Sequence, residues 1–567
     1  MAAIGLGLSS IGATGWAQVP LDPQPMLLPQ AQRVKGTRPK SNPKVLPPAA
    51  TKLDPSLQRL ASPATLALPT KPEQVRIAAM RPLSLKDVEN LAEVNNPNLK
   101  AIASQVDQAE SNLRARIAAW YPNLSITANG FPQYTGGQQF FNDVNIMTVT
   151  SGVQSTYTNR WQMAGAITAN WDVINPQRVP QVSAARDQFE KAKNQYLIAL
   201  RELRLQASQS YFKLQLADEN VRVGQQSVRA SLVSLRDAKA RFQAGVATKL
   251  EVLEAETQLG RDEQLLSDSL AEQSIARRDL ARLTDLPQNI NPTASEPLRP
   301  LGLWKPSLQE SILAAYTFRE ELDNIILDIS ASNSQANAAL GQVQPFMSIV
   351  NTLTAFRYTG VEAIIVDLPG TYGYAVQNSV SLNFKMSVFD GGAARALYRQ
   401  NKQKAQESAY NFALTRDQLR YQVEESFYQL ANSSRNIQTT SKEVQSSRES
   451  LRLARLRFQA GVTTQREVIN NQRDLTQAEI RYASALGRYN TFLAELRRRT
   501  GLDQIVECRP QYLPAIKPSS DDSAVPVPPT PLLPACMTGK ISAVPATPAA
   551  PHRFARFRVA NEQTRPS

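Results

Sequence analysis

The sequence contains one structural unit twice. Residues 241–259 read RFQAGVATKLEVLEAETQL, and residues 457–475 read RFQAGVTTQREVINNQRDL. Upstream of each copy, apolar residues recur every seven positions. In the first copy they are Phe242, Leu235, Val228, Val221, Leu214 and Ala207. Each has an apolar counterpart 216 residues later, at Phe458, Leu451, Val444, Ile437, Leu430 and Val423. Such heptads are typical of long helices packed side by side. Their duplication indicates a tandem structural repeat.

The formal net charge of +14 is concentrated near the two ends of the chain. Residues 18–82 carry a net charge of +7, residues 509–567 carry +4, and the two segments hold 25 of the 37 prolines. Pro-rich basic segments bury too little apolar surface to fold. We therefore expect both to be extended, and deletion of 18–75 or 515–567 to leave the folded protein intact. Because the central region carries little net charge, nucleic acid is not expected as a partner.

Residues 1–17 resemble a secretory signal that is cleaved after Ala17, although the usual Lys/Arg-rich start is missing. No later stretch reaches the roughly 18–20 apolar residues of a membrane-spanning helix. An exported chain of this kind is expected to be periplasmic, secreted, or inserted in an outer membrane as a barrel.

The residues needed for metal and catalytic sites are scarce. The sequence has one histidine, His552, and two cysteines, Cys508 and Cys536, all near the C-terminus. The cysteines either form a disulfide in an oxidising compartment or remain free thiols. Phosphate-binding and dinucleotide-binding motifs are missing too. We therefore expect no cofactor, no metal and no enzymatic activity.

The chain divides into a first repeat, a short linker and a second repeat, flanked by a signal-like segment and two Pro-rich tails. The expected bounds are 1–17 for the signal-like segment, 18–83 for a disordered basic linker, 84–290 for the first repeat, 291–306 for the inter-repeat linker, 307–503 for the second repeat and 504–567 for the C-terminal tail.

Each repeat is predicted to run helix, two strands, long helix, turn and helix. The expected elements of the first are helix 85–119 interrupted at Asn96-Pro97, strands 124–130 and 162–173, and helices 176–242 and 246–283. Those of the second are helix 307–344, strands 346–358 and 377–389, and helices 392–458 and 463–500. Gly245 and Gly461 end the long helices, where a left-handed residue is needed.

The predicted strands alternate apolar and polar residues. In 379–388, Val380, Leu382, Phe384, Met386 and Val388 lie on one face and serines, Asn383 and Lys385 on the other. Without a covering domain nearby, this pattern favours a strand with lipid on one face and a polar lumen on the other. Four strands cannot close a barrel, and open edges are not tolerated in lipid. The chain is therefore expected to form an oligomer.

The ordered set of features resembles the TolC-type outer-membrane efflux proteins over about residues 84–503. The resemblance rests on Asn96-Pro97, the breaks at Pro122 and Pro345, VFDGGAAR at 388–395 and the two RFQAGV turns. It implies a mixed α/β membrane protein: a homotrimer with a 12-stranded β-barrel, four strands from each protomer, continued by a periplasmic α-helical coiled-coil barrel. The implied function is an exit duct that receives cargo from an inner-membrane pump, of RND or ABC type, through a periplasmic adaptor.

The resemblance also assigns roles to the two turns. They are expected to dock the adaptor through Arg241, Phe242, Gly245, Val246, Ala247 and Thr248, and through Arg457, Phe458, Gly461, Val462, Thr463 and Thr464. A tyrosine and an arginine that latch the closed entrance in the family correspond here to Phe458 and Thr463. The latch is therefore expected to be weaker or built from other residues.

Acidic residues after each turn are expected at the periplasmic entrance. Glu251 and Glu467 stand six residues after the turn glycines, and Glu254 and Asn470 stand three residues further on. Repeated acidic positions at a narrow mouth would favour cations. Alternatively, Glu251 and Glu467 are solvated residues at helix starts, where the dipole stabilises negative charge.

One rival interpretation is a soluble periplasmic coiled-coil structural or adaptor protein. It would explain the helical hairpins equally well, but not the alternating strands. The sequence does not distinguish drug efflux from type I protein secretion.

Overall fold

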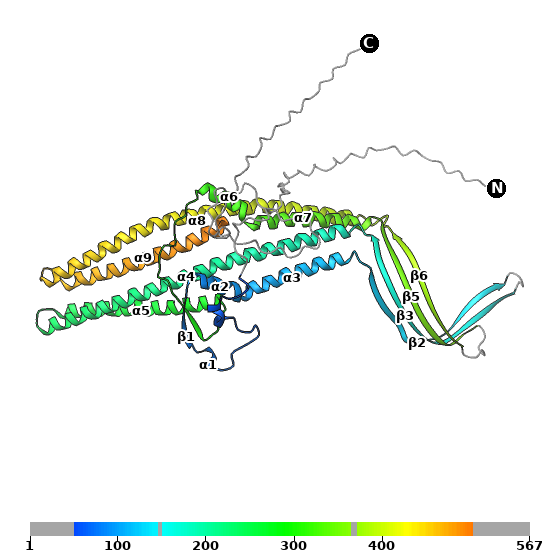
Figure 1. The fold of residues 1–567 in the computed structure, drawn as a ribbon, viewed down its shortest axis with the longest axis horizontal. Coiled ribbons are helices and arrows are strands. Elements are labelled where there is room, and N and C mark those ends of the chain that lie inside the picture. Colours follow the sequence, from blue (N-terminus) through cyan, green and yellow to red (C-terminus); the bar gives the residue numbers. More distant parts are fainter. Residues whose placement is uncertain (1–49, 146–149, 364–370, 503–567) are drawn as a thin grey trace, which may run out of the picture.

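The computed structural model describes residues 50–145, 150–363 and 371–502. The molecule is elongated, with long helices at one end and a bent four-stranded sheet at the other (Figure 1). The duplicated α/β architecture is as expected from the sequence. The predictions for 1–17, 18–49 and 504–567, including those for Cys508 and Cys536, lie outside the described residues.

The helices of the first repeat begin and end at recognisable signals. They are α2 (Leu85–Asn95), α3 (Pro97–Ala118), α4 (Arg178–Gln243) and α5 (Lys249–Leu283). Ser84 caps α2 by accepting a hydrogen bond from the Asp87 amide, and Pro97 occupies the first turn of α3, where no amide donor is needed. With 66 residues, α4 is about 100 Å long at 1.5 Å per residue.

The second repeat has the same order of helices. They are α6 (Leu308–Phe318), α7 (Glu320–Leu340) with the short 3₁₀ helix η2 (Gly341–Val343), α8 (Ala393–Gln459) and α9 (Gln465–Thr500). The prediction of one helix over 307–344 is wrong, because Arg319 is extended and separates α6 from α7. Arg319 stands where the first repeat has Asn96, but no proline follows it to mark the break.

Two short helices meet end to end beside each long helix. In the first repeat, Asn96 Nδ2 donates to the Leu283 carbonyl at the end of α5 (2.9 Å). Asn95 Nδ2 donates to the Thr284 carbonyl (3.2 Å) and the Leu60 carbonyl (2.9 Å). These side chains satisfy carbonyls that a helix end leaves without partners.

The matching junction of the second repeat is ionic. Arg201 of α4, only 2% exposed, pairs with Glu320 and donates to the Arg498 carbonyl at the end of α9 (3.3 Å). Glu321 accepts from Arg319 (2.7 Å) and Arg498 (3.1 Å). Burial alone would raise the pKa of Glu321, but the hydrogen bond from Arg319 and the charge of Arg498 outweigh it. They hold this pKa well below its usual value.

The large sheet is antiparallel, in the order β2-β3-β5-β6, so that β2 and β6 are its edges. The strands are β2 (Asn123–Asn145), β3 (Thr150–Ile174), β5 (Phe346–Ala363) and β6 (Thr371–Lys385). They are mostly longer than the sequence predicts. The exception is the end of β6, which was expected to continue to 389 and stops at Lys385.

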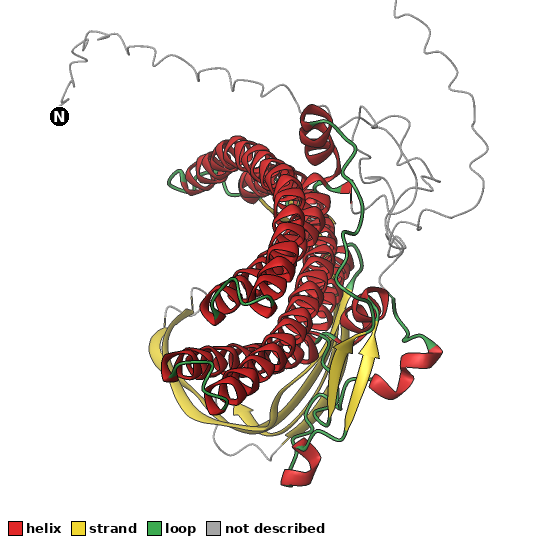
Figure 2. Ribbon diagram, turned by 90° about the vertical axis from the view of Figure 1, so that its left-hand side faces the viewer, coloured by secondary structure: helices red, strands yellow, loops and turns green. Residues whose placement is uncertain are grey.

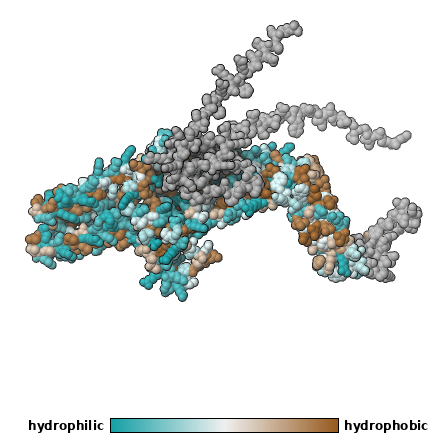
Figure 3. Space-filling model, in the orientation of Figure 1, coloured by the Kyte–Doolittle hydropathy of each residue, from teal (hydrophilic) through white to brown (hydrophobic). Residues whose placement is uncertain are grey.

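The register puts polar and apolar residues on opposite faces of this sheet. Ser125, Thr168, Thr352 and Ser379 lie opposite one another in one row on the polar face. On the other face, Trp171, Ile349 and Leu382 form a row, and apolar side chains dominate the exposed surface of the sheet (Figure 3). The predicted alternation is therefore present in the fold.

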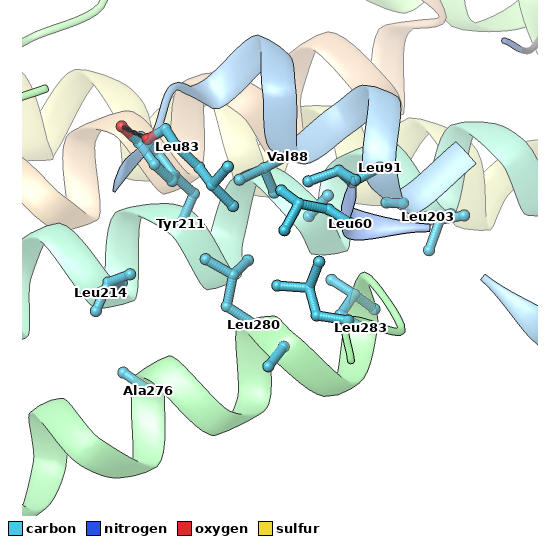
Figure 4. Packing of buried hydrophobic residues seen from close by; sticks show 14 of the residues in the cluster. Leu60, Leu83, Val88, Leu91, Leu203, Tyr211, Leu214, Ala276, Leu280 and Leu283 are labelled. Atoms are coloured by element: carbon cyan, nitrogen blue, oxygen red, sulfur yellow. Dashed lines mark hydrogen bonds between the residues drawn. The ribbon is translucent and has the colours of Figure 1, made fainter. Parts of the chain in front are cut away.

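Residues 50–83 are not the disordered linker that their composition suggested. They contain η1 (Pro55–Leu60), α1 (Pro72–Val75) and β1 (Ala79–Leu83). Strand β1 pairs in parallel with β4 (Ile290–Ala294), which lies at the start of the expected inter-repeat linker. Leu57 and Leu60 are buried in the core where α2, α4 and α5 meet (Figure 4). We therefore expect a deletion that includes 50–75 to disturb this core, whereas the sequence alone predicted that 18–75 is dispensable.

Viewed along the long axis, the helices form an arc (Figure 2). Helix α4 lies in its middle and packs against α3, α5, α7 and α9, whereas α8 packs against α6, α7 and α9. Among the described residues, α8 therefore has helices packed on one flank only, whereas α4 has them on both. None of the helices in the described ranges is long and apolar enough to cross a membrane.

Candidate functional site at the helical tips

Each helical hairpin ends in the same glycine turn. Gly245 and Gly461 have φ angles of +76° and +72°. At the first turn, the Gly245 amide donates to the Phe242 carbonyl (3.0 Å) and the Val246 amide to the Arg241 carbonyl (2.9 Å). The second turn repeats this pattern with Gly461 and Val462. This is a Schellman motif, in which glycine avoids the strain that a β-carbon would cause. Both predicted helix ends are confirmed.

The next helix of each hairpin starts at a threonine, but the two starts differ. Thr248 and Glu251 form a reciprocal capping box, with the Glu251 amide donating to Thr248 Oγ1 (3.4 Å). Thr464 makes no side-chain cap. Glu467 instead accepts from Arg457 Nη1 (3.0 Å) and from the Thr463 hydroxyl. Glu251 and Glu467 thus both stabilise their own turn.

The ends of the hairpins present apolar side chains to solvent. Phe242, Val246 and Val462 are exposed, and apolar patches are visible at the tips on the helical end of the molecule (Figure 3). A β-carbon placed on either turn glycine would meet no atom within 4 Å. The turns are therefore accessible to another protein.

Below the turns, side chains tie the two hairpins together. The guanidinium of Arg241 lies over the Phe458 ring, 4.4 Å from its centroid. Arg466 of α9 donates from Nε to Glu254 Oε1 of α5 (2.9 Å), and this carboxylate raises the pKa of Arg466. Gln465, which is buried, donates to Ser234 of α4. A small apolar cluster that includes Leu235, Ala255 and Ile469 lies behind these contacts.

Two of the acidic residues expected at the entrance take part in these contacts and in the turn itself. Glu254 and Glu467 are each paired with an arginine. Asn470 is exposed, whereas Glu251, Glu254 and Glu467 are half-buried. Thr463, at one of the family's latch positions, donates a hydrogen bond to Glu467 of its own hairpin. Phe458, at the other latch position, does reach the opposite hairpin, with Arg241 as its partner.

Sequence reasoning missed Arg466, Gln465 and the pairing role of Arg241. A signal was present in the differences between the two copies. Position 466 carries arginine where the first copy has Leu250, and Glu254 carries a carboxylate where the second copy has Asn470. The salt bridge joins Arg466 to Glu254, two positions at which the copies differ in charge.

The fold is an elongated pair of helical hairpins with a four-stranded antiparallel sheet at the opposite end (Figure 1). The sequence matches the family described as "Outer membrane efflux protein" over residues 88–285 and 319–502. The chain belongs to this family. It is the outer-membrane duct of a tripartite efflux system, with a large periplasmic helical part, so the rival soluble interpretation is wrong.

Individual proteins show the same relationship. The chain is similar to the cobalt-zinc-cadmium resistance protein CzcC of Cupriavidus metallidurans, with 24% identity over 72% of this chain and 88% of the relative. Its fold resembles the CmeC outer-membrane channel of Campylobacter jejuni (TM-score 0.61, 15% identity, 79% of this chain and 96% of the other). It also resembles VceC of Vibrio cholerae (TM-score 0.59, 15% identity, 74% and 96%).

Proposed function

We propose that three copies of this chain form one closed channel, with the sheets joined in the outer membrane and the helices joined in the periplasm. The proposal is carried by the two open edges of the sheet, β2 and β6. Unpaired backbone groups at a sheet edge are costly in lipid, and closure into a barrel removes them. The number three comes from the family.

The flank of α8 that no other described helix or strand covers supports the same assembly. Tyr410, Leu414, Tyr421 and Tyr428 are exposed along α8 at heptad-like intervals. The long helix of the first repeat has additional helices packed at its side. A neighbouring protomer would supply these missing helices and bury the aromatic stripe, which favours association.

The hairpin turns are proposed to dock a periplasmic adaptor that connects the duct to an inner-membrane pump. The exposed Phe242, Val246 and Val462 offer apolar contacts, and the two turn glycines leave room for a partner to approach closely. Arg241, Ala247, Thr248, Arg457 and Thr464 border the same surface. Either an RND or an ABC pump is compatible with such tips.

The contacts between the hairpins are proposed to hold the periplasmic entrance closed. Arg241 with Phe458, and Glu254 with Arg466, link one hairpin to the other near the tips. Opening would require the hairpins to separate and these links to break. Glu251, Glu467 and Asn470 would then border the mouth, where the carboxylates favour cations.

Divalent metal cations are the first cargo to test, because of the similarity to CzcC. A strain that lacks this protein should become sensitive to cobalt, zinc or cadmium, and the wild-type gene should restore resistance. Capture of the tagged protein from cross-linked membranes should recover an adaptor and a pump. Unchanged metal resistance would exclude this cargo, and recovery of the protein without any adaptor would contradict the docking role.

A further inference from the structure

A charged side chain lies on the apolar face of the large sheet. Arg357 of β5 is directly opposite Met163 of β3 and Tyr374 of β6. It lies on the same face as Leu382, which is opposite Ile349. Among the strand residues that the structure describes, no other Asp, Glu, Lys or Arg lies on this face.

Arg357 is near the outer edge of this face. The end of β5 at Phe346 adjoins the periplasmic helices, so higher residue numbers in β5 are closer to the cell exterior. From Ile349 to Arg357 the strand rises about 27 Å, or roughly 20 Å along the membrane normal at a tilt of about 40°. The next row outward has Trp161 and Tyr372 on either side of Thr359. Aromatic rows mark the membrane interface, so Arg357 lies at the level of the outer-leaflet headgroups.

No residue in the described part of the chain neutralises Arg357. Its side chain is exposed and makes no hydrogen bond or ion pair with a described residue. Strand β5 is flanked by β3 and β6 of its own chain. A neighbouring copy could therefore pair only beyond β6, about 10 Å from β5, and would not place an acidic residue directly opposite Arg357. A charge on a lipid-facing surface requires an anion or water as its partner.

The side chains around Arg357 are hydrogen-bond donors. Tyr374 is directly opposite, and Trp161 and Tyr372 are diagonal neighbours, within the reach of long and aromatic side chains. Their exposed fractions are 81%, 54% and 75%. Guanidinium and indole groups can only donate, and a phenol can also donate. Such a cluster favours an anion, and the planar guanidinium matches two oxygen atoms of a phosphate.

The row on the membrane side of Arg357 consists mostly of small residues. Ala128 of β2, Gly165 of β3 and Ala355 of β5 lie side by side, and Val376 of β6 completes the row. An acyl chain can therefore approach the backbone closely beneath the cation, where dispersion contacts add to the headgroup interaction. A lipid phosphate benefits from both features, whereas a free phosphate ion benefits only from the donors.

We propose that Arg357, Trp161, Tyr372 and Tyr374 bind the phosphate group of an anionic lipid in the outer leaflet, with one lipid on each protomer. The guanidinium donates to two phosphate oxygens, and the indole and the phenols donate to the others. The bound lipid fixes the height of the sheet in the membrane. This inference rests on the proposed assembly, in which the apolar face meets lipid, and adds the class of lipid that this face binds.

Native mass spectrometry of the full-length protein, purified in detergent, tests the site with lipid A as the probe. Lipid A with both of its phosphates is titrated in parallel with the same lipid after the phosphates have been removed. Wild type should bind one phosphorylated lipid per protomer. Its affinity for this lipid should be roughly tenfold or more above that for the dephosphorylated lipid, because charge-assisted hydrogen bonds to the phosphate are lost.

Arg357→Gln should weaken binding of the phosphorylated lipid roughly tenfold. Trp161→Phe should weaken it less, because the guanidinium remains. Arg160→Gln is the matched control, since Arg160 lies opposite Gly360 on the polar face, and it should bind the lipid like wild type. Equal affinity of Arg357→Gln and wild type, or equal affinity of wild type for the two lipids, would overturn the lipid site. A protein that runs as a monomer in unboiled gels would instead contradict the proposed trimer.

Discussion

At the tips, one glycine serves two separable purposes. Gly461 permits the left-handed turn, and its lack of a side chain keeps the turn surface open. Gly461→Trp should leave the amount of assembled protein in the membrane nearly normal, because strain at one such position costs on the order of 1 kcal/mol. It should abolish export and adaptor cross-linking, because the indole obstructs docking.

Gly461→Asn is the matched control for that substitution. Asparagine tolerates the left-handed conformation better than other residues and adds little bulk. Export should therefore remain close to the wild-type level. Full export by Gly461→Trp would show that this turn is a helix end and not a docking surface.

The turns could be predicted residue by residue, because a Schellman turn depends on local sequence. Gly245, Gly461 and the capping Thr248 are all visible in the two RFQAGV segments. The partners of Arg241 and Arg466 could not be predicted in the same way. Their contacts join residues 217 and 212 positions apart, Arg241 with Phe458 and Glu254 with Arg466, and depend on how two hairpins pack.

Among the elements, the sheet provides a test of which face meets lipid. Leu382 lies on the apolar face and Ser381 on the polar face of β6. Leu382→Arg should reduce assembled protein in the membrane, because a charge at mid-bilayer costs about 2–4 kcal/mol. Ser381→Arg should assemble normally. Equal tolerance of the two arginines, measured by unboiled gel mobility of outer-membrane fractions, would contradict the assignment of the faces.

The N-terminal segment provides a second test, at the core shown in Figure 4. Leu60 is buried there against α2, α4 and α5. Leu60→Ala should lower the stability of the fold by about 2–5 kcal/mol, the usual range for a leucine removed from a core. The temperature at which the assembled protein dissociates should fall. Leu66→Ala, at an exposed position, is the control and should leave that temperature unchanged.

The ionic junction between α6, α7 and α9 predicts a dependence on pH. Glu321→Gln leaves Arg319 and Arg498 buried with a weaker partner, and breaking a buried pair costs about 3–5 kcal/mol. The pKa of Glu321 lies below its ordinary value of 4.5 in the folded protein. The stability that Glu321 contributes is therefore complete above the unfolded pKa and is lost as the pH falls through the folded pKa.

Wild type should accordingly be more stable than Glu321→Gln by a constant amount from neutral pH down to mildly acidic pH, and the difference should shrink in stronger acid. Thermal dissociation at several pH values measures it. Glu443→Gln removes an exposed pair with Arg481 and should have little effect. A difference that grows in acid would contradict the role of Glu321.

Helices and strands differ in how far the sequence determines them. Heptads, Pro97 and the two turn glycines place most helix ends within a few residues. The break at Arg319 is different, because it depends on Glu321 and Gln422 holding its side chain. The prediction of disorder for 50–83 was wrong, because it rested on the Pro-rich basic composition and did not take account of Leu57 and Leu60, which are buried in the core. Residues 386–389 have the strand pattern but lack a strand partner within one chain.

At the scale of the whole molecule, the two repeats have the same order of elements but occupy different places in the fold. Helix α4 and strand β3 lie in the middle of one chain, whereas α8 and β6 lie at its margin. The sequence predicts an open margin, because four strands cannot close. It does not set the number of copies, which depends on the curvature of the assembled sheet and comes here from the family.

In the proposed trimer, the contacts between the hairpins would occur once in each protomer, so their effects on the entrance would add. A cation over an aromatic ring contributes about 0.5–1 kcal/mol at an exposed site, and a trimer would contain three copies of the Arg241 and Phe458 pair. The Glu254 and Arg466 pair adds to this in the same direction. In the proposed trimer, both contacts would have to break for the entrance to open, so both would favour the closed state.

The most direct measurement is the single-channel conductance of the purified protein in a planar lipid bilayer. The variant that combines Arg241→Ala with Arg466→Ala should assemble normally and conduct several-fold more than wild type, because the links between the hairpins are gone. Arg222→Ala, which removes a pair within α4 far from the tips, should conduct like wild type. If the combined variant assembles and its conductance equals that of wild type, these contacts do not close the entrance.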